Sequence, residues 1–321
     1  MSGTALRSIT AALWAVTALL VGVLPAHATS ELALTFDDLP ITPEATESLV
    51  ATLQANSVPE VYGFFNGASL GDISTPSPLL TATRAWVAAG YPLGNHTYTH
   101  TDLNRVTVDA FIQDIAANEI PLRDLSQGMH YHLFRYPLLH EGGTPEKRAA
   151  VRAYLRANGY TMAPVSLDFQ DWAWTEAHLR CRRSGDTEAL SRLDDLFIIH
   201  ALSRLAHARH QSRHVYGREI RFVALLHATA FQAHILPRLL ESLGTAFEEG
   251  VRYISTTHAL QDPAYREDHG IAREEGATWL DLQELAKYGA VETGPQVPSE
   301  LGRICRPGLL EQLYRELPVA N

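Results

Sequence analysis

The stretch LALTFDD, residues 32–38, is the segment from which the fold can be inferred. It is apolar up to position 36 except for Thr35, and it ends in the adjacent carboxylates Asp37 and Asp38. A short apolar run of this kind is typical of a buried strand. Side chains of neighbouring strand residues diverge, so one carboxylate can bind a metal ion while the other faces a substrate. A solvated turn or a helix N-cap is the alternative interpretation of this pair.

Similar β-prone runs recur along the chain, with helical patterns between them. The expected strands are residues 32–36, 61–65, 91–94, 131–135, 160–167, 221–226 and 251–255. Apolar residues at three- and four-residue spacing predict helices over residues 45–53, 78–89, 108–125, 145–158 and 234–249. Strands that alternate with helices indicate an α/β fold with a parallel sheet. Seven strands in about 225 residues favour a barrel-like sheet over an open one.

Two segments interrupt this alternation. Leucines between residues 175 and 219 keep helical spacing, which predicts a helical insertion packed outside the repeat. Residues 269–321 are punctuated by Gly and Pro and are expected to form a carboxy-terminal extension with helices at 280–288 and 309–317. The main domain is therefore expected to span residues 29–268.

Residues 1–28 have the pattern of a secretory signal peptide. Arg7 precedes a mostly apolar run over residues 9–24, and Ala-His-Ala at 26–28 predicts cleavage after Ala28. An uncleaved membrane anchor is the alternative, but the run is shorter than the roughly 20 apolar residues that a span needs. No second long apolar stretch follows, so we expect no membrane span in the mature chain. We expect an exported protein, periplasmic or extracellular.

Composition limits the partners that the protein can have. The 321 residues carry 36 acidic and 26 basic side chains, a formal net charge of −10. Proteins that bind the phosphate backbone carry an excess of Lys and Arg, so nucleic acid is not an expected partner. Cys181 and Cys305 are the two cysteines, and in an exported protein they could pair. No sequence feature specifies the oligomeric state.

The segment GNHTYTH, residues 94–100, contains a possible metal-binding pair. His96 and His100 are four residues apart, a spacing that lets both imidazoles reach one ion. With Asp38 they would make a three-ligand set that leaves a coordination position open, as catalytic sites do. Two solvated surface histidines, or the iron site of an oxygenase, are the alternative interpretations.

Three further polar groups follow expected strands. Arg135 lies in FRYPL at 134–138, Asp171 in DFQDW at 168–172, and His227 ends the apolar run VALLH. An Arg and an Asp at neighbouring strand ends can pair and tune nearby proton affinities, although a surface salt bridge is the simpler interpretation. A lone histidine after a strand is more often structural than catalytic.

A second group of histidines occurs at positions 200, 207, 210 and 214. Three of them share helical spacing, but arginines surround them and would oppose the binding of a cation. We interpret this group as a solvated helix face. The five other polar clusters each follow a different expected strand, and the carboxyl ends of barrel strands are where active sites are assembled.

This set of motifs, in this order, resembles the polysaccharide deacetylase family, also called the NodB homology domain or carbohydrate esterase family four. The family's Thr-Phe-Asp-Asp, His-x-x-x-His, Asp-x-x-Asp-Trp and Leu-x-His are similar to residues 35–38, 96–100, 168–172 and 225–227. The resemblance extends over about residues 31–265. It implies a distorted (β/α) barrel of about seven parallel strands and a divalent metal, usually Zn2+. It also implies an acetylated glycan substrate that loses acetyl groups from N-acetylated or, less often, O-acetylated sugars.

The resemblance also implies a role for each matching residue. Asp37 would be the catalytic base and His227 the general acid. The metal ligands would be Asp38, His96 and His100, and Arg135 and Asp171 would form a pair that tunes the catalytic groups. Trp172 and Leu225 would line the acetyl pocket.

One position departs from the family pattern. The third motif normally reads Arg-x-Pro-Tyr, and here Leu138 occupies the Tyr place. The backbone amide of Leu138 can still donate to an oxyanion, but any contact of a Tyr side chain is lost. This departure leaves open a carbohydrate-binding module that keeps the metal without turnover, beside an O-acetyl glycan esterase.

Overall fold

The structure is a computed structural model that describes residues 29–247 and 250–306. The expected signal peptide, residues 1–28, and the expected helix at 309–317 lie outside these residues. The sheet is built around β1 (Ser30–Leu39), whose apolar side chains are almost completely buried. β1 pairs in parallel with β2 (Tyr62–Phe65), with β7 (Phe222–His227) and, near its start, with β8 (Val251–Tyr253).

The remaining strands extend the sheet in both directions from β1, and the order is β5-β4-β3-β2-β1-β7-β6. All strand pairs are parallel, and these strands are β3 (Leu93–Asn95), β4 (Leu133–Phe134), β5 (Thr161–Met162) and β6 (Leu167–Asp168). Seven strands laid flat would extend about 29 Å from first to last. Leu167 follows Met162 by five residues and so lies within about 17 Å of it. The sheet is therefore curled into a half-barrel, which confirms the expected distorted barrel.

The expected strand at 160–167 is wrong as a single strand. Its first part forms β5 at one end of the sheet, and its last part forms β6 at the other end. Pro164 lies between them and has no amide hydrogen to donate to a strand ladder. The side chain of Arg135 reaches the segment between β5 and β6, where its Nε donates to the carbonyl oxygen of Ala163 at 3.0 Å.

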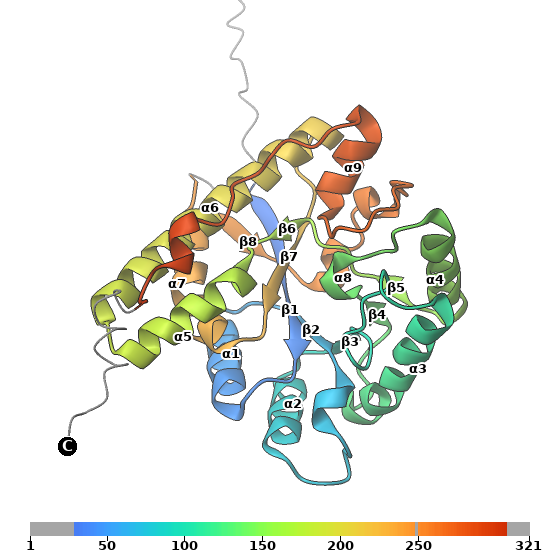
Figure 1. Ribbon diagram of the computed structural model, residues 1–321, viewed down its shortest axis with the longest axis horizontal. Helices are drawn as coiled ribbons and strands as arrows, with labels where there is room; N and C mark the ends of the chain where they lie inside the picture. The colour runs from blue at the N-terminus through green and yellow to red at the C-terminus, as the bar shows by residue number, and fades with distance from the viewer. Residues whose placement is uncertain (1–28, 248–249, 307–321) are drawn as a thin grey trace, which may run out of the picture.

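The helices of the repeat lie outside the sheet (Figure 1). They are α1 (Pro43–Ala55), α2 (Pro78–Ala88), α3 (Val108–Leu125), α4 (Pro145–Ala157), α7 (Ala230–Thr245) and the short α8 (Thr256–Ala259). Each begins after a Ser or Thr whose hydroxyl accepts a hydrogen bond from an amide of the first turn, which satisfies an otherwise free donor. The expected helix at 234–249 starts earlier, at Ala230, because Thr229 is its cap.

The insertion forms α5 (Thr175–Ser184) and the 30-residue α6 (Thr187–Tyr216). Leu193, Phe197 and Leu205 of α6 are buried in the same hydrophobic cluster as the strands. In the extension, α9 (Trp279–Tyr288) packs on α6, and the chain that follows runs back along α6 (Figure 1). The insertion and the extension are thus packed together on one side of the half-barrel.

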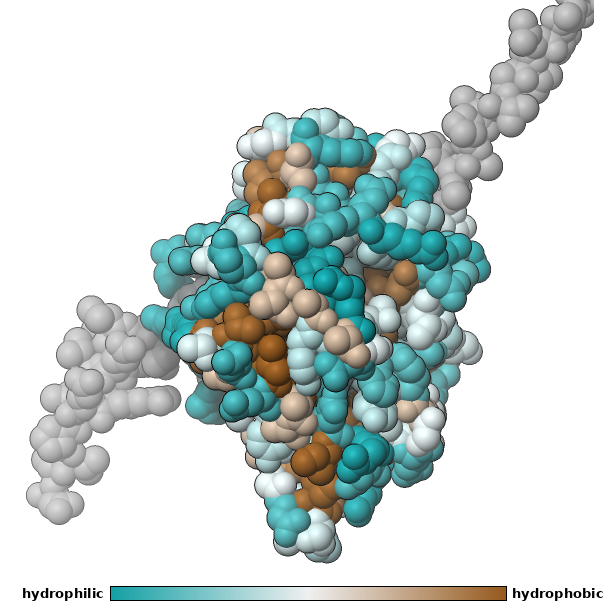
Figure 2. Space-filling model, turned by 90° about the vertical axis from the view of Figure 1, so that its right-hand side faces the viewer, coloured by the Kyte–Doolittle hydropathy of each residue, from teal (hydrophilic) through white to brown (hydrophobic). Residues whose placement is uncertain are grey.

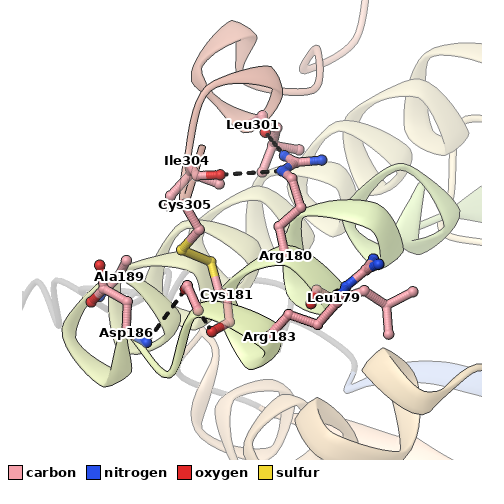
Figure 3. The surroundings of a disulfide bond; sticks show 10 residues. Leu179, Arg180, Cys181, Arg183, Asp186, Ala189, Leu301, Ile304 and Cys305 are labelled. Carbon is pink, nitrogen blue, oxygen red and sulfur yellow. Dashed lines mark hydrogen bonds between the residues drawn. A yellow bond between two sulfur atoms is a disulfide. The ribbon is translucent and has the colours of Figure 1, made fainter. Parts of the chain in front are cut away.

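A disulfide between Cys181 and Cys305 joins α5 to the end of the described extension (Figure 3). The two cysteines are 124 positions apart in the sequence. Arg180 reinforces the connection, since its Nη2 donates to the carbonyl oxygen of Leu301 at 2.6 Å. Its Nε donates to the carbonyl oxygen of Ile304 at 3.3 Å. The course of the extension is therefore held covalently at its far end.

The face turned toward the viewer in Figure 2 is largely hydrophilic and carries separate, small hydrophobic patches. Isolated apolar patches of this kind are normal on a folded protein. Within residues 29–247 and 250–306, no helix combines the length and the apolar character that crossing a membrane requires.

Candidate active site

The polar clusters that follow the strands meet at one end of the half-barrel. Asp37 and Asp38 lie near the end of β1, and His96 and His100 follow β3. His227 ends β7, where it is the register partner of Asp37. Because the strands are parallel, their carboxyl ends lie at the same edge, as the sequence predicts.

Asp38, His96 and His100 form a group that could hold a metal ion. Their nearest ligand atoms all lie within 4.8 Å of one another, and no other group of three such residues occurs in the part of the chain that the structure describes. Asp38 Oδ1 is 3.4 Å from His100 Nε2 and 3.7 Å from His96 Nε2. Ligands about 2.1 Å from a tetrahedral ion are about 3.4 Å apart, so the two distances from Asp38 are close to those around a small divalent ion.

Hydrogen bonding prepares His96 to act as a ligand. Its Nδ1 donates to the carbonyl oxygen of Arg135 at 2.9 Å, which leaves Nε2 with a lone pair directed at Asp38. Burial lowers the pKa of His96 to about 3, although the nearby carboxylate of Asp38 acts in the opposite direction. His96 is therefore neutral at physiological pH, the state that a metal ligand requires.

The loop that carries the histidines is held by asparagines that the sequence analysis did not select. Asn66, directly after β2, donates from Nδ2 to the carbonyl oxygens of His96 and Thr97 at 2.6 and 3.0 Å. Asn95 accepts a hydrogen bond from the amide of Thr97. His100 has a φ of 57°, in a region that His tolerates better than most residues. The position of Asn66 at a strand end is the signal that could have identified it.

Asp37 is buried and bound to an arginine rather than to the solvent. Its Oδ1 accepts a hydrogen bond from Arg135 Nη1 at 2.8 Å, and the same nitrogen donates to Thr35 Oγ1 at 2.6 Å. The Arg135 guanidinium also lies 4.1 Å from the centre of the Phe64 ring. These contacts hold one oxygen of Asp37 and leave Oδ2 facing His96 at 3.6 Å.

The expected pair between Arg135 and Asp171 is wrong. Asp171 binds His227 instead, because its Oδ1 accepts from His227 Nδ1 at 2.8 Å and its Oδ2 accepts from the His227 amide at 2.7 Å. Both carboxylate oxygens of Asp171 are thus occupied, and Arg135 is bound to Asp37. The two residues tune different groups.

The charge of Asp171 determines the protonation of His227. Burial lowers the pKa of His227, but the Asp171 carboxylate outweighs it, with smaller contributions from Asp37 and Asp38, and raises the pKa to about 10. Since Nδ1 already donates to Asp171, the proton on Nε2 is the one that can leave. His227 is therefore a proton donor at neutral pH.

Replacing Asp171 with Asn is expected to lower the pKa of His227, because the carboxylate that raises it is lost while burial remains. The His227 imidazolium of the variant therefore loses its proton at a lower pH than that of the wild type. An NMR titration of the His227 ring in the metal-free protein measures the change. An unchanged titration midpoint in the variant would show that Asp171 does not control this proton.

A cleft of about 920 Å3 connects these groups with the insertion and the extension. Leu138, Trp172 and Leu225 line it, and the first two are more than half exposed, at 52% and 57%. His207 of α6 and several residues between 273 and 296 line it as well. The cleft thus has one wall of strand ends and another built from the insertion and the extension.

Residues 26–163 match the sequence family described as polysaccharide deacetylase. No curated protein matches the sequence. The matched span contains the first three motifs, together with their buried strand β1 and the Asp38, His96 and His100 group. Residues 26–163 belong to the polysaccharide deacetylase family.

The deacetylase fold also appears among solved structures. The chitin deacetylase from the fungal pathogen Colletotrichum lindemuthianum is 23% identical, with 73% of this chain and 88% of that chain covered and a TM-score of 0.52. A mutant of a CE4 family pseudoenzyme from Bacillus anthracis is 14% identical, with 73% and 68% covered and a TM-score of 0.51. A mutant of this pseudoenzyme with restored enzymatic activity is 16% identical, with the same coverage and a TM-score of 0.50. At these identities the similarity establishes the fold and leaves the activity open.

The histidines of α6 are not one solvated face, contrary to the sequence-based interpretation. His200 is buried, and its Nε2 lies 3.1 Å from Gln170 Oε1. His207 lines the cleft, and burial lowers its pKa. His210 and His214 are exposed but face Glu292 and Glu284 of the extension. The extension packs along α6 and leaves His210 and His214 exposed, an arrangement that the helical pattern alone does not reveal.

Proposed function

We propose that this protein is an exported, metal-dependent deacetylase that hydrolyses the N-acetyl groups of a polysaccharide or oligosaccharide. The observation that carries the proposal is the position of a buried carboxylate, Asp37, and a proton donor, His227, on neighbouring strand ends beside the three-ligand group. Hydrolysis of an amide needs all three components: a base, an acid and a centre that activates the carbonyl.

Asp37 acts as the general base in this proposal. Arg135 and Thr35 fix the side-chain arrangement around Oδ1, so Oδ2 is the oxygen that accepts the proton of the attacking water. A buried carboxylate with one oxygen held in this way loses little freedom when it accepts the proton. General base catalysis by a positioned side chain contributes about 10²- to 10⁴-fold to the rate.

His227 acts as the general acid. An amide nitrogen is a poor leaving group until it is protonated, and His227 holds a proton at neutral pH because Asp171 raises its pKa to about 10. An ester oxygen is a better leaving group than an amide nitrogen, so it depends less on a proton donor. This property of His227 favours N-acetyl over O-acetyl groups as the substrate.

Asp38, His96 and His100 would hold the divalent metal, for which we propose Zn2+ because two imidazoles and a carboxylate are typical zinc ligands. When bound, the ion supplies Lewis acidity that polarises a carbonyl and lowers the pKa of water. The backbone amide of Leu138, at the edge of the cleft, donates to the developing oxyanion. Leu138 and Trp172 give the cleft exposed apolar surface against which a sugar ring or an acetyl methyl group can pack.

Two observations support export. The pattern of residues 1–28 is that of a signal peptide, and the chain forms a disulfide between Cys181 and Cys305. Disulfides persist in oxidising compartments and are rare in the cytosol.

The proposal is tested by measuring acetate release from N-acetylated glycans, such as chito-oligosaccharides and peptidoglycan, and from O-acetylated glycans. We expect acetate from an N-acetylated glycan, loss of more than 90% of the rate after chelation, and recovery when Zn2+ is added. Faster release from the O-acetylated glycans would identify an esterase instead. Glycan binding without acetate release, with metal bound, would identify a carbohydrate-binding module.

A further inference from the structure

The start of the extension lies directly on the loops that follow the site motifs. We call residues 273–279 the extension loop. Asn104, four positions after His100, donates from Nδ2 to the carbonyl oxygen of Glu274 at 2.6 Å. At the other end of the loop, the amide of Trp279 donates to the carbonyl oxygen of Val165 at 2.6 Å. The extension loop is therefore anchored on both sides of the half-barrel opening.

Between these anchors, Gly276 contacts the third motif more closely than any other residue type could. A Cβ at position 276 would lie 2.1 Å from the carbonyl oxygen of Leu138 and 3.4 Å from the ring of His140. Real Cβ atoms do not approach a backbone oxygen so closely, so glycine is required for the contact. Gly276 and Leu138 also both line the cleft.

The backbone that Gly276 contacts has an uncommon conformation. Leu138 and Leu139 have φ values of 59° and 56°, the left-handed region that bulky residues rarely adopt. Such conformations are strained and persist only where surrounding contacts enforce them. Here residues 136–140 are held by turn hydrogen bonds, by a hydrogen bond between His140 Nδ1 and Asp102 Oδ1 at 2.8 Å, and by Gly276.

We propose that Gly276 of the extension is a positioning residue for the reaction, because its contact with Leu138 holds the left-handed turn that presents the Leu138 amide to the oxyanion. This inference rests on the deacetylase function proposed above. The contact of Gly276 is made by backbone atoms on both sides, so it depends on the absence of a side chain at 276. Small displacements of an oxyanion donor reduce transition-state binding far more than substrate binding.

The test compares Gly276→Ala with Gly302→Ala in the Zn2+-loaded, disulfide-bonded protein. Gly302 is in the same extension, and a Cβ there would meet nothing within 4 Å. Removal of one oxyanion donor costs about 10²- to 10³-fold in kcat. Gly276→Ala displaces the Leu138 amide without removing it, so we expect a smaller loss of kcat, about 10- to 100-fold. KM and the zinc affinity should change less than threefold, and Gly302→Ala should behave as the wild type.

A second measurement separates positioning from a general structural defect. The affinity for a tetrahedral phosphonamidate analogue of the substrate should fall in Gly276→Ala by the same factor as kcat, while the affinity for the product is kept. If Gly276→Ala does not fold, Asn104→Ala, which removes the anchor at Glu274, replaces it and should lower kcat three- to tenfold with the same signature.

The outcomes distinguish this inference from the proposed function. A wild-type protein that releases no acetate contradicts the deacetylase function itself. An active wild type with kcat in Gly276→Ala equal to that in Gly302→Ala overturns the positioning role. Equal losses of kcat, product affinity and zinc affinity would also overturn it, because they would indicate a general distortion of the site.

Discussion

Replacing Asp37 with Asn is expected to lower kcat/KM for acetate release about 10³-fold while the protein still binds its metal ion. The asparagine has nearly the same volume, and its oxygen can still accept the hydrogen bond from Arg135 Nη1. An amide cannot take a proton from water at neutral pH, so the general base is lost. The measurement is the rate of acetate release under saturating Zn2+, together with the zinc content of the purified variant.

Asp195→Asn is a suitable control for Asp37→Asn, because Asp195 lies on α6, is exposed and is paired with Arg238. It should keep the wild-type rate. An Asp37→Asn variant whose kcat/KM stays within tenfold of the wild type, with zinc bound, contradicts the assignment of Asp37 as the base. In Asp37→Asn the buried Arg135 keeps no carboxylate partner. Thermal unfolding of both variants shows whether this unpaired charge destabilises the fold.

The class of fold and the barrel-like sheet could be predicted from the sequence, but the pairing of every strand could not. Each expected strand is a local apolar run, and local runs are visible in the pattern. The division of 160–167 into β5 and β6 depends on which strands each half meets, and these partners are β4 and β7. Such pairings join residues far apart in the chain. Pro164 was the local sign that one continuous strand was not possible.

The residues of the site could be predicted because they follow strands. Which of these residues hydrogen-bond to one another could not be predicted. β1 and β4 are separated by two strands in the sheet order, yet Arg135 reaches Asp37 because the sheet is curled. Asp171, three residues after the end of β6, meets His227 because β6 pairs with β7. Strand order and curvature decide these contacts, and neither is encoded in the spacing of the motifs.

The extension was the part least accessible to prediction. Its Gly and Pro residues predicted an irregular course with a helix at 280–288, and the described part, up to residue 306, follows this prediction with α9. The pattern did not indicate that the extension lines the cleft or contacts Leu138. The requirement for glycine at 276 arises from an approach between backbones 138 positions apart. A composition pattern carries no information about such an approach.

Replacing Asp38 with Asn is expected to have the opposite signature, in which metal binding is lost first and activity falls as a consequence. Both Asp37 and Asp38 lie close to His96 Nε2, at 3.6 and 3.7 Å, so distance alone does not say which carboxylate is the ligand. The partners of each carboxylate identify the ligand. Asp37 is held by Arg135, whereas Asp38 Oδ1 is 3.4 Å from His100 Nε2. Among the described ion pairs, Asp38 is paired only with histidines. Asparagine also tolerates the left-handed φ of 66° at position 38, so the backbone is preserved.

Isothermal titration of the metal-free protein with Zn2+ measures the change. Loss of an outer hydrogen-bond partner of a ligand costs about 10- to 100-fold in metal affinity, and we expect loss of the anionic ligand itself to cost more. Raising the zinc concentration should then restore part of the activity of Asp38→Asn but none of that of Asp37→Asn, in which the ion is already bound. The reverse result, with zinc affinity lost in Asp37→Asn and kept in Asp38→Asn, would exchange the roles of the two carboxylates, because the residue that binds Arg135 would then be the ligand.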